Sequence, residues 1–184
     1  MRCSFLAFCL LLASGGASGK EAADESTLYG RFAISALWLE TAGGDPYGQT
    51  YGAGLVILEG GVGARLSDHA SLAVLLRAGF FHAGVGLELT LQPSGDRSAD
   101  GWTFRVAPVA FVDAVSCRSW DRLDCATAIF AIVELGPQYR WAHRWGGNTL
   151  GASLNVGAAR LGGPRGTSVS LAAGLTGVRY QLEF

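Results

Sequence analysis

The sequence predicts an all-β protein: an eight-stranded antiparallel up-and-down transmembrane β-barrel. Three observations support this fold class. Apolar and polar residues alternate with a period of two through many short segments, which is the pattern of strands with two unlike faces. Gly, Asp, Ser and Pro separate these segments, and glycine supplies 27 of the 184 residues. The last alternating segment continues to Phe184, as expected for a closing strand that pairs with the first one.

The first 19 residues have the composition of a secretory signal peptide. Met1-Arg2 is a short positive start, residues 5–13 are uncharged and largely apolar, and residues 14–19 are small. The apolar run is well short of the ~20 residues that a membrane helix requires. We expect cleavage after Ala17 or Gly19. Lipidation at Cys9 is not expected, because the preceding residues are not the small ones that such a site needs.

The remainder of the chain is long enough for one domain. We divide it into a short N-terminal segment, residues 20–26, and a barrel, residues 27–184. Hydrophobic residues make up 49% of the chain and mean hydropathy is +0.29, yet the mature part contains no apolar run long enough for a membrane helix. The net charge is −1 and no basic cluster is present, so nucleic acid is not an expected partner.

Four strands are expected in the first half of the barrel. Residues 27–41 and 51–66 alternate regularly, and a third strand starts at residue 71 after a polar turn. The alternation then changes phase at Phe81. Either a turn within residues 81–86 or a β-bulge accounts for the change, and we favour the turn because it makes the strand number even.

Four further strands follow in the second half. A long polar loop at residues 92–101 precedes them. The two halves of the last strand are out of phase, which predicts a bulge near Thr176-Gly177. The expected strands are 102–116, 126–141, 150–158 and 168–184, and the expected turns among them include 143–148 and 162–167.

The two faces of these strands predict a barrel with polar residues inside. Charged residues lie on one face and aliphatic or aromatic residues on the other, whereas a soluble sandwich would turn its charges outward. Because eight strands enclose a space that side chains can fill, we expect a network of ion pairs that plugs the lumen; a conducting pore is the alternative. The expected members are Glu59, Arg65, Glu88, Arg105, Glu134 and Arg140.

Aromatic residues concentrate near the ends of the expected strands. Tyr and Trp prefer the interface between membrane and water, so this distribution is typical of the girdles of a membrane barrel. The alternative is that these rings belong to an ordinary hydrophobic core. Examples are Tyr29, Trp38, Trp102, Tyr139, Trp141 and Tyr180.

The C-terminal run Val178, Tyr180, Leu182 and Phe184 is similar to the assembly signal that ends bacterial outer-membrane β-barrels. With the signal peptide and the strand pattern, residues 27–184 resemble the small eight-stranded outer-membrane barrels represented by the transmembrane domain of outer membrane protein A. The resemblance implies a place in the bacterial outer membrane, contact with its lipid and with the barrel assembly machinery, a monomer, and no cofactor. One departure is the long 92–101 loop, which strand parity assigns to the periplasmic side.

Cys117 and Cys125 are the two cysteines of the mature chain. An exported protein meets oxidising conditions, so we expect a disulfide between them. Two cysteines with no nearby histidine make a poor zinc site. Counting strands back from Phe184 places this loop on the side of the barrel opposite the C-terminus.

The sequence offers no catalytic constellation. His69, His82 and His143 lie in turns or strands without a His-x-Ser pair, and no Gly-x-Ser-x-Gly motif is present. We therefore expect a non-enzymatic structural or interaction protein whose outer loops contact an unknown surface ligand. Two alternatives remain open: a lipid-modifying enzyme of the outer leaflet, and a soluble exported β-sandwich or calyx that binds a small apolar ligand.

Overall fold

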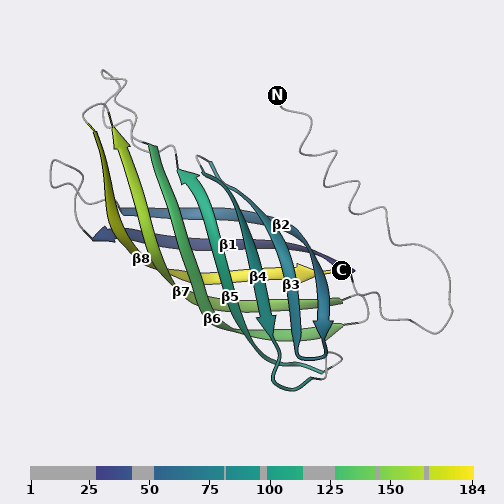
Figure 1. Cartoon of the computed structure of the whole chain (residues 1–184). Coiled ribbons are helices and arrows are strands. Elements are labelled where there is room, and N and C mark those ends of the chain that lie inside the picture. Colours follow the sequence, from purple (N-terminus) through teal and green to yellow (C-terminus); the bar gives the residue numbers. More distant parts are fainter. Residues whose placement is uncertain are drawn as a thin grey trace, which may run out of the picture.

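The computed structural model is a closed antiparallel barrel in which each strand pairs with the next along the chain and β8 pairs with β1 (Figure 1). It describes residues 28–42, 52–80, 82–95, 99–113, 127–143, 146–163 and 166–184. This confirms the predicted all-β class, strand number and up-and-down order. Within those ranges no helix is long and apolar enough to cross a membrane. The strands are β1 (Leu28–Ala42), β2 (Gly52–Ser67), β3 (Ala70–Ala78), β4 (His82–Leu91), β5 (Gly101–Asp113), β6 (Thr127–His143), β7 (Gly146–Gly163) and β8 (Gly166–Glu183).

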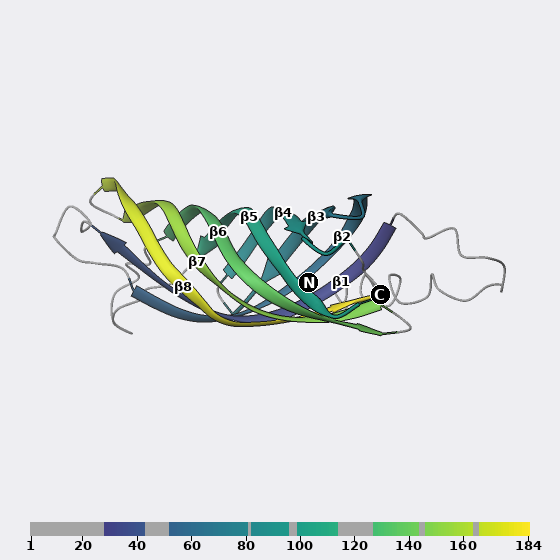
Figure 2. The same ribbon diagram turned by 90° about the horizontal axis from the view of Figure 1, so that it is seen from below.

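A stagger in the register tilts the strands. The line of paired residues that starts at Arg31 crosses β3 at Leu75 and β6 at Ile132, and it returns to β1 at Thr41. A closed sheet with such a stagger tilts its strands by about 35–45° from the barrel axis. Figure 2 accordingly shows strands of opposite walls crossing at a steep angle. We call the end that holds Leu28 and Phe184 the C-terminal rim, and the other end the opposite rim.

Alternation along each strand separates the inside of the barrel from the outside. On β1, the odd-numbered residues from Arg31 to Leu39 are buried and the even-numbered residues from Phe32 to Trp38 are exposed. The other strands follow the same rule with their own phase. Each strand therefore has one face in the lumen and one face outside, as a period of two requires.

The phase change after β3 is a turn, as predicted, but it begins earlier than residues 81–86. β3 ends at Ala78 and β4 begins at His82. The backbone N–H of Gly79 donates to the carbonyl of His82 at 2.8 Å and closes the turn. Residues 83–86 are paired with β3 and belong to the strand, so the predicted boundary was wrong by a few residues.

The bulge predicted near Thr176-Gly177 is present. The β8–β1 register shifts between Val178 and Thr176, and the β7–β8 register shifts at the same place. Gly177 and Val178 are both exposed, so the bulge resets the faces of β8. The predicted change of phase between the two halves of the last strand is therefore confirmed.

β7 is much longer than the predicted 150–158. Glycine-containing ends, such as Gly147 and Gly162, pair with β6 and extend the strand in both directions. Glycine has no side chain to show an alternating pattern, so the sequence underestimates the strand there. β5 is described from Gly101 to Asp113, and the predicted residues 114–116 lie outside the described residues.

The long loop at the C-terminal rim is fastened to its neighbours. The N–H of Gln92 donates to the carbonyl of His69 at 2.8 Å, and Nδ1 of the His69 ring lies 3.0 Å from the carbonyl of Gln92. Asp100 accepts a hydrogen bond from the N–H of Ala142 at 2.8 Å. These hydrogen bonds hold both ends of the loop against the C-terminal rim, although the loop is longer than a tight turn.

Phe184 completes the closure of the barrel. Its N–H donates to the carbonyl of Gly30 at 3.0 Å, and its carbonyl accepts from the N–H of Gly30 at 2.7 Å. The Phe184 ring lies over Gly30, where a Cβ atom would stand 2.5 Å from the ring atom Cε2. The last residue thus pairs with β1 and covers its glycine.

Candidate functional site: a charged layer inside the barrel

The interior of the barrel has three layers, which can be followed along β5. Thr103 lies nearest the C-terminal rim, Arg105 follows, and Val109 and Phe111 lie toward the opposite rim. β6 passes through the same layers in the opposite direction. We call the three the polar vestibule, the charged layer and the apolar layer.

The charged layer takes one ionised side chain from each of six consecutive strands, with signs that alternate. Arginines come from the odd-numbered strands and glutamates from the even-numbered ones. β8 adds Arg179 and the amide of Gln181. All of these side chains are buried. The six in strand order are Arg31, Glu59, Arg77, Glu88, Arg105 and Glu134.

Glu88 is the most heavily coordinated carboxylate of this layer. Arg31 binds it with both terminal nitrogens, one of them at 2.7 Å from Oε2. Nε of Arg105 lies 2.5 Å from Oε2, and Nη2 of Arg179 lies 3.3 Å from it. The hydroxyl of Thr90 donates to Oε1 at 3.1 Å. Bidentate arginine–carboxylate pairs of this kind are strong and directional.

The other two carboxylates extend the network across the lumen. Arg77 binds Glu134 with both terminal nitrogens, at 2.7 and 2.5 Å, and Arg105 pairs with the same carboxylate. Nη2 of Arg77 also lies 3.2 Å from Glu59. Arg179 reaches Oε2 of Glu59 at 3.2 Å. The charged groups therefore form one continuous buried network.

Four arginines face three glutamates in this network, so it carries one excess positive charge. The Oε1 atom of Gln181 accepts from Nη2 of Arg31 at 2.7 Å and from Nη1 of Arg179 at 2.6 Å. Its amide nitrogen donates to Glu183 at 3.0 Å. A neutral amide oxygen thus occupies the position where a fourth carboxylate would balance the charge. Buried charges are tolerated because each makes hydrogen-bonded pairs.

Four of the six residues predicted for the lumen network lie in the charged layer: Glu59, Glu88, Arg105 and Glu134. The other two do not. Arg140 lies in the polar vestibule, where its Nε is 3.5 Å from Glu183. Arg65 is partly exposed on β2, three inward positions from Glu59 toward the C-terminal rim.

Sequence reasoning missed Arg31, Arg77, Arg179 and Gln181. Arg77, Arg179 and Gln181 stand between outward apolar or aromatic residues, as Arg179 does between Val178 and Tyr180. Arg31 follows a glycine and precedes the outward Phe32. The same alternation that identified Glu59 could therefore have found them. What alternation could not supply is the stagger between strands, which decides which inward residues share a height.

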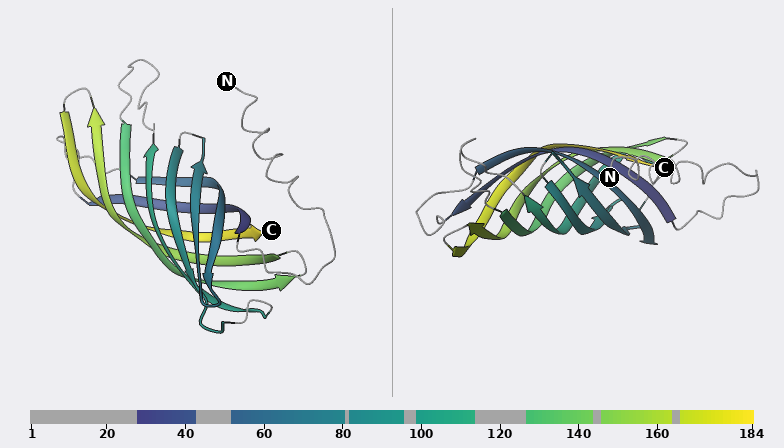
Figure 3. Two further views of the ribbon diagram at one scale, coloured as in Figure 1. Left: turned by 45° about the vertical axis from the view of Figure 1, so that its right-hand side comes forward. Right: turned by 90° about the horizontal axis from the view of Figure 1, so that it is seen from above.

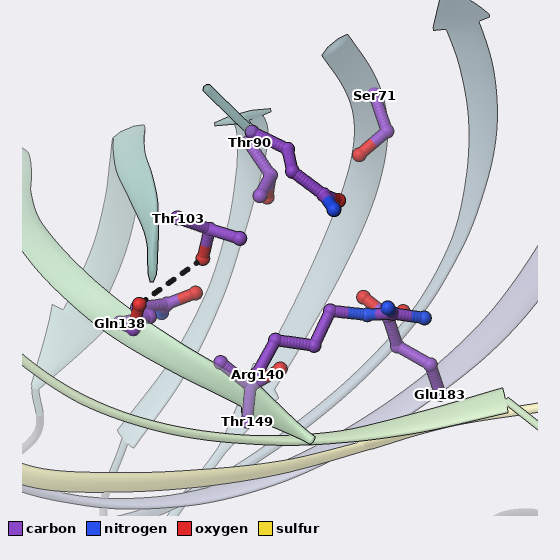
Figure 4. A pocket seen from close by; sticks show the side chains of 8 residues that line it. Ser71, Thr90, Thr103, Gln138, Arg140, Thr149 and Glu183 are labelled. Carbon is purple, nitrogen blue, oxygen red and sulfur yellow. Dashed lines mark hydrogen bonds and ion pairs between the residues drawn. The ribbon is translucent and has the colours of Figure 1, made fainter. Parts of the chain in front are cut away.

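The polar vestibule is narrow. The hydroxyl of Thr103 donates to the carbonyl of Gln138 at 3.5 Å, and Arg140 and Glu183 approach each other across the space (Figure 4). The cavity between these side chains has a volume of about 10 Å³, enough for about one water molecule. It is lined by Ser71, Thr90, Gln92, Thr103, Gln138, Arg140, Thr149 and Glu183.

The apolar layer fills the lumen on the other side of the charged layer. The rings of Phe111 and Phe130 stack with centroids 4.7 Å apart, and the ring of His82 lies 4.2 Å from that of Phe111. His82, one of the three histidines of the sequence, is thus packed at the edge of a hydrophobic cluster. Aliphatic side chains from both walls complete it, among them Leu37, Leu39, Ile57, Val109 and Ile132.

The outer surface of the barrel is apolar over most of its height. Among the described strand residues that point outward, charges occur at Glu40 and Arg160, both toward the opposite rim. The charge-free outward run of β1, from Leu28 to Trp38, measures about 33 Å along the strand. A tilt near 45° reduces this to roughly 25 Å along the barrel axis.

Aromatic side chains gather at the C-terminal rim. The rings of Trp102 and Tyr139 meet edge to face with centroids 5.4 Å apart, and those of Tyr139 and Trp141 lie 5.0 Å apart. Tyr180 and Phe184 are exposed near the same end of β8. A band of outward rings therefore borders the apolar surface at this end.

The predicted assembly segment lies on the outer face. Val178, Tyr180 and Leu182 pair with the first strand and are exposed, as is Phe184. Their role in assembly stays a prediction. Cys117, Cys125 and residues 1–26 lie outside the described residues, so the disulfide and the signal peptide remain predictions as well. The strands flanking the cysteine loop, β5 and β6, end and begin at the opposite rim.

Comparison with protein-family models, with curated proteins and with solved structures gives no match. The site is the interior of an eight-stranded closed barrel that holds a buried network of ion pairs.

Proposed function

We propose that this protein is an integral barrel of the bacterial outer membrane, of the small eight-stranded kind represented by the transmembrane domain of outer membrane protein A. Its role is structural or in surface interaction, and its lumen is plugged. One observation carries the proposal: the barrel is apolar outside and charged inside. A bilayer stabilises that arrangement, whereas water does not.

The dimensions of the outer surface support the proposal. The apolar band of membrane barrels is about 25 Å tall and is bordered by aromatic residues. The outward run of β1 has this height, and the Trp102–Tyr139–Trp141 cluster lies at its border. Glu40 and Arg160 border the band on the other side.

The filled lumen supports a plugged barrel rather than an open channel. A charged layer with paired side chains and an apolar layer with stacked rings follow one another along the axis. The polar vestibule, which lies between the charged layer and the C-terminal rim, has room for about one water molecule. We therefore place the interaction function in the loops at the opposite rim, which join β1 to β2 and β5 to β6.

Fractionation with a heat-modifiability gel tests the proposal. The full chain, expressed with its own N-terminus in a Gram-negative host, should remain in the membrane pellet after alkaline carbonate extraction. Unboiled and boiled samples should migrate differently, because a closed barrel resists detergent until it is heated. A carbonate-soluble periplasmic protein would contradict the proposal.

Recordings on planar lipid bilayers test the plugged lumen separately. We expect no stepwise conductance from refolded protein, because both interior layers must open before ions can pass. Steady channels from the unmodified protein would contradict the plug and leave the membrane location intact.

A further inference from the structure

The barrel wall is lowest at the β3–β4 hairpin. β3 has 9 residues and β4 has 10, whereas β7 and β8 have 18 each. The N–H of Gly79 and the carbonyl of His82 close the hairpin directly after Ala78. Figure 3 shows this turn well short of the level reached by the β7–β8 hairpin, so the opposite rim is slanted.

The outward face of this hairpin is apolar up to its tip. Leu72, Val74 and Leu76 follow one another on β3, and Phe80 stands in the turn with 95% of its side chain exposed. β1 and β7, by contrast, carry outward charges as they approach the same rim. Among the described residues of the hairpin, no outward polar side chain ends the apolar surface at the tip, although a polar turn ends it at the C-terminal rim.

The hairpin is slightly shorter than the apolar band of a membrane barrel. β3 runs from Ala70 to Ala78, which gives about 26 Å along the strand before the turn begins. The tilt of the barrel reduces this to roughly 20 Å along the axis. The apolar band of a membrane barrel is about 25 Å tall. The hairpin therefore enters the height of that band and is too short to project beyond it.

We propose that the β3–β4 turn ends among the acyl chains of the outer leaflet, with Phe80 in contact with lipid. The β7–β8 hairpin, on the other side of the barrel, extends beyond the membrane. The inference rests on the proposed membrane location and assigns one specific surface to one partner, the acyl region of a bilayer. Apolar contact removes the exposed Phe80 ring from water.

Depth-dependent quenching tests this inference. In the full mature chain, Cys117→Ser and Cys125→Ser remove the native cysteines. One cysteine is then introduced at a chosen position and carries an environment-sensitive NBD label. The labelled variants are Phe80→Cys, the mid-wall control Leu76→Cys, and the tip control Thr167→Cys, an exposed residue at the top of β8. Each is refolded into phosphatidylcholine vesicles that contain either spin-labelled lipid or none.

We expect lipid-borne spin labels to quench NBD at residues 80 and 76 and to leave residue 167 unquenched. Aqueous iodide should give the reverse order. Quenching by iodide at residue 80 together with lipid quenching at residue 76 overturns the inference and keeps the proposed function. Absence of lipid quenching at residue 76 overturns the proposed function itself.

A second attachment site guards against a folding defect of the Phe80 variant. Ala83→Cys places the label on the outward face at the start of β4, next to the same turn. Heat-modifiable migration selects the folded protein before each measurement. We expect residue 83 to behave as residue 80 does, and iodide quenching at both positions overturns the inference.

Discussion

Gln181 joins two arginines that meet where the barrel closes. Arg31 belongs to β1 and Arg179 to β8, and the amide oxygen accepts a hydrogen bond from each. The ionised groups alternate in sign from Arg31 of β1 to the glutamate of β6, and β8 adds a further arginine. Two positive charges therefore meet at the seam between β8 and β1. Because Gln181 is neutral, the fourth arginine has no matching carboxylate, and the charged layer keeps an excess of one positive charge.

Gln181→Glu should stabilise the barrel. The added carboxylate would give Arg31 and Arg179 an ionised acceptor in place of the neutral amide oxygen, and it would balance the charge of the layer. This gain should exceed the loss of the amide hydrogen bond to the partly exposed Glu183, so we expect the free energy of unfolding to rise by about 1–2 kcal/mol. Urea unfolding from lipid vesicles measures the change.

Asn155→Asp is the matched control for that prediction. Asn155 is equally buried, but its polar neighbours are the hydroxyls of Ser153 and Thr176. An unpaired buried carboxylate should destabilise the barrel or remain protonated. If both acidic substitutions lower stability alike, the charge balance of the layer is not what limits it.

Glu88→Gln should be strongly destabilising. It removes the carboxylate that three arginines share and leaves them with a larger excess of buried positive charge. The loss should be about 3–5 kcal/mol. Glu183→Gln is the comparison, because Glu183 is partly exposed and its pair with Arg140 is long at 3.5 Å; its loss should stay below about 1 kcal/mol. A mild effect of Glu88→Gln in the same urea titration would contradict the network as described.

At the scale of strands, closure depends on the contact between Phe184 and Gly30. Deleting Phe184 should sharply reduce the heat-modifiable protein recovered from membranes, because the last pair of backbone hydrogen bonds and the ring over Gly30 are both lost. Gly30→Val should reduce it as well, since a Cβ there meets the Phe184 ring.

Gly60→Ala serves as the control for those variants. A Cβ at Gly60 meets no atom within 4 Å, so membrane levels should match those of the unmodified protein. Unchanged levels after deletion of Phe184 would refute the interpretation of the C-terminal run as an assembly signal.

Cys117 and Cys125 should form a disulfide in the mature protein. Reduction should leave the barrel folded, because the strand pairing of β5 with β6 and the charged layer do not depend on it. Mass spectrometry after thiol alkylation checks the oxidation, and heat-modifiable migration after reduction checks the fold. Free thiols in protein isolated from the membrane would contradict the prediction.

The alternation of apolar and polar residues made the strands predictable. Where that alternation is absent, the predicted strand boundaries differ from those of the structure. The bulge at Gly177 was predictable because the alternation changes phase there in the sequence. The glycine-containing ends of β7 display no phase, so their pairing could not be read. For the charged layer, Glu88 and Arg105 were recognisable as inward residues, but their shared height depends on register. Arg65 and Arg140 have the same pattern and lie nearer the C-terminal rim.

At the scale of the whole molecule, the barrel encloses polar and charged groups next to a compact apolar layer. The charged layer is closed around the lumen by strands that are distant in sequence, such as β1 and β4 through Arg31 and Glu88. The outer wall is apolar at the same height. The proposed place of this barrel in a membrane depends on that inversion of inside and outside.

The unfolding free energy of Leu154→Arg in phosphatidylcholine bilayers, compared with that of Val169→Arg, tests this central claim most directly. Both residues are exposed and point outward, but Leu154 pairs with β6 and β8 in mid-wall and Val169 pairs with Arg160 near the opposite rim. We predict a loss of about 2–4 kcal/mol for Leu154→Arg and about 0–1 kcal/mol for Val169→Arg. Equal and small losses at the two positions would contradict a lipid-facing outer wall.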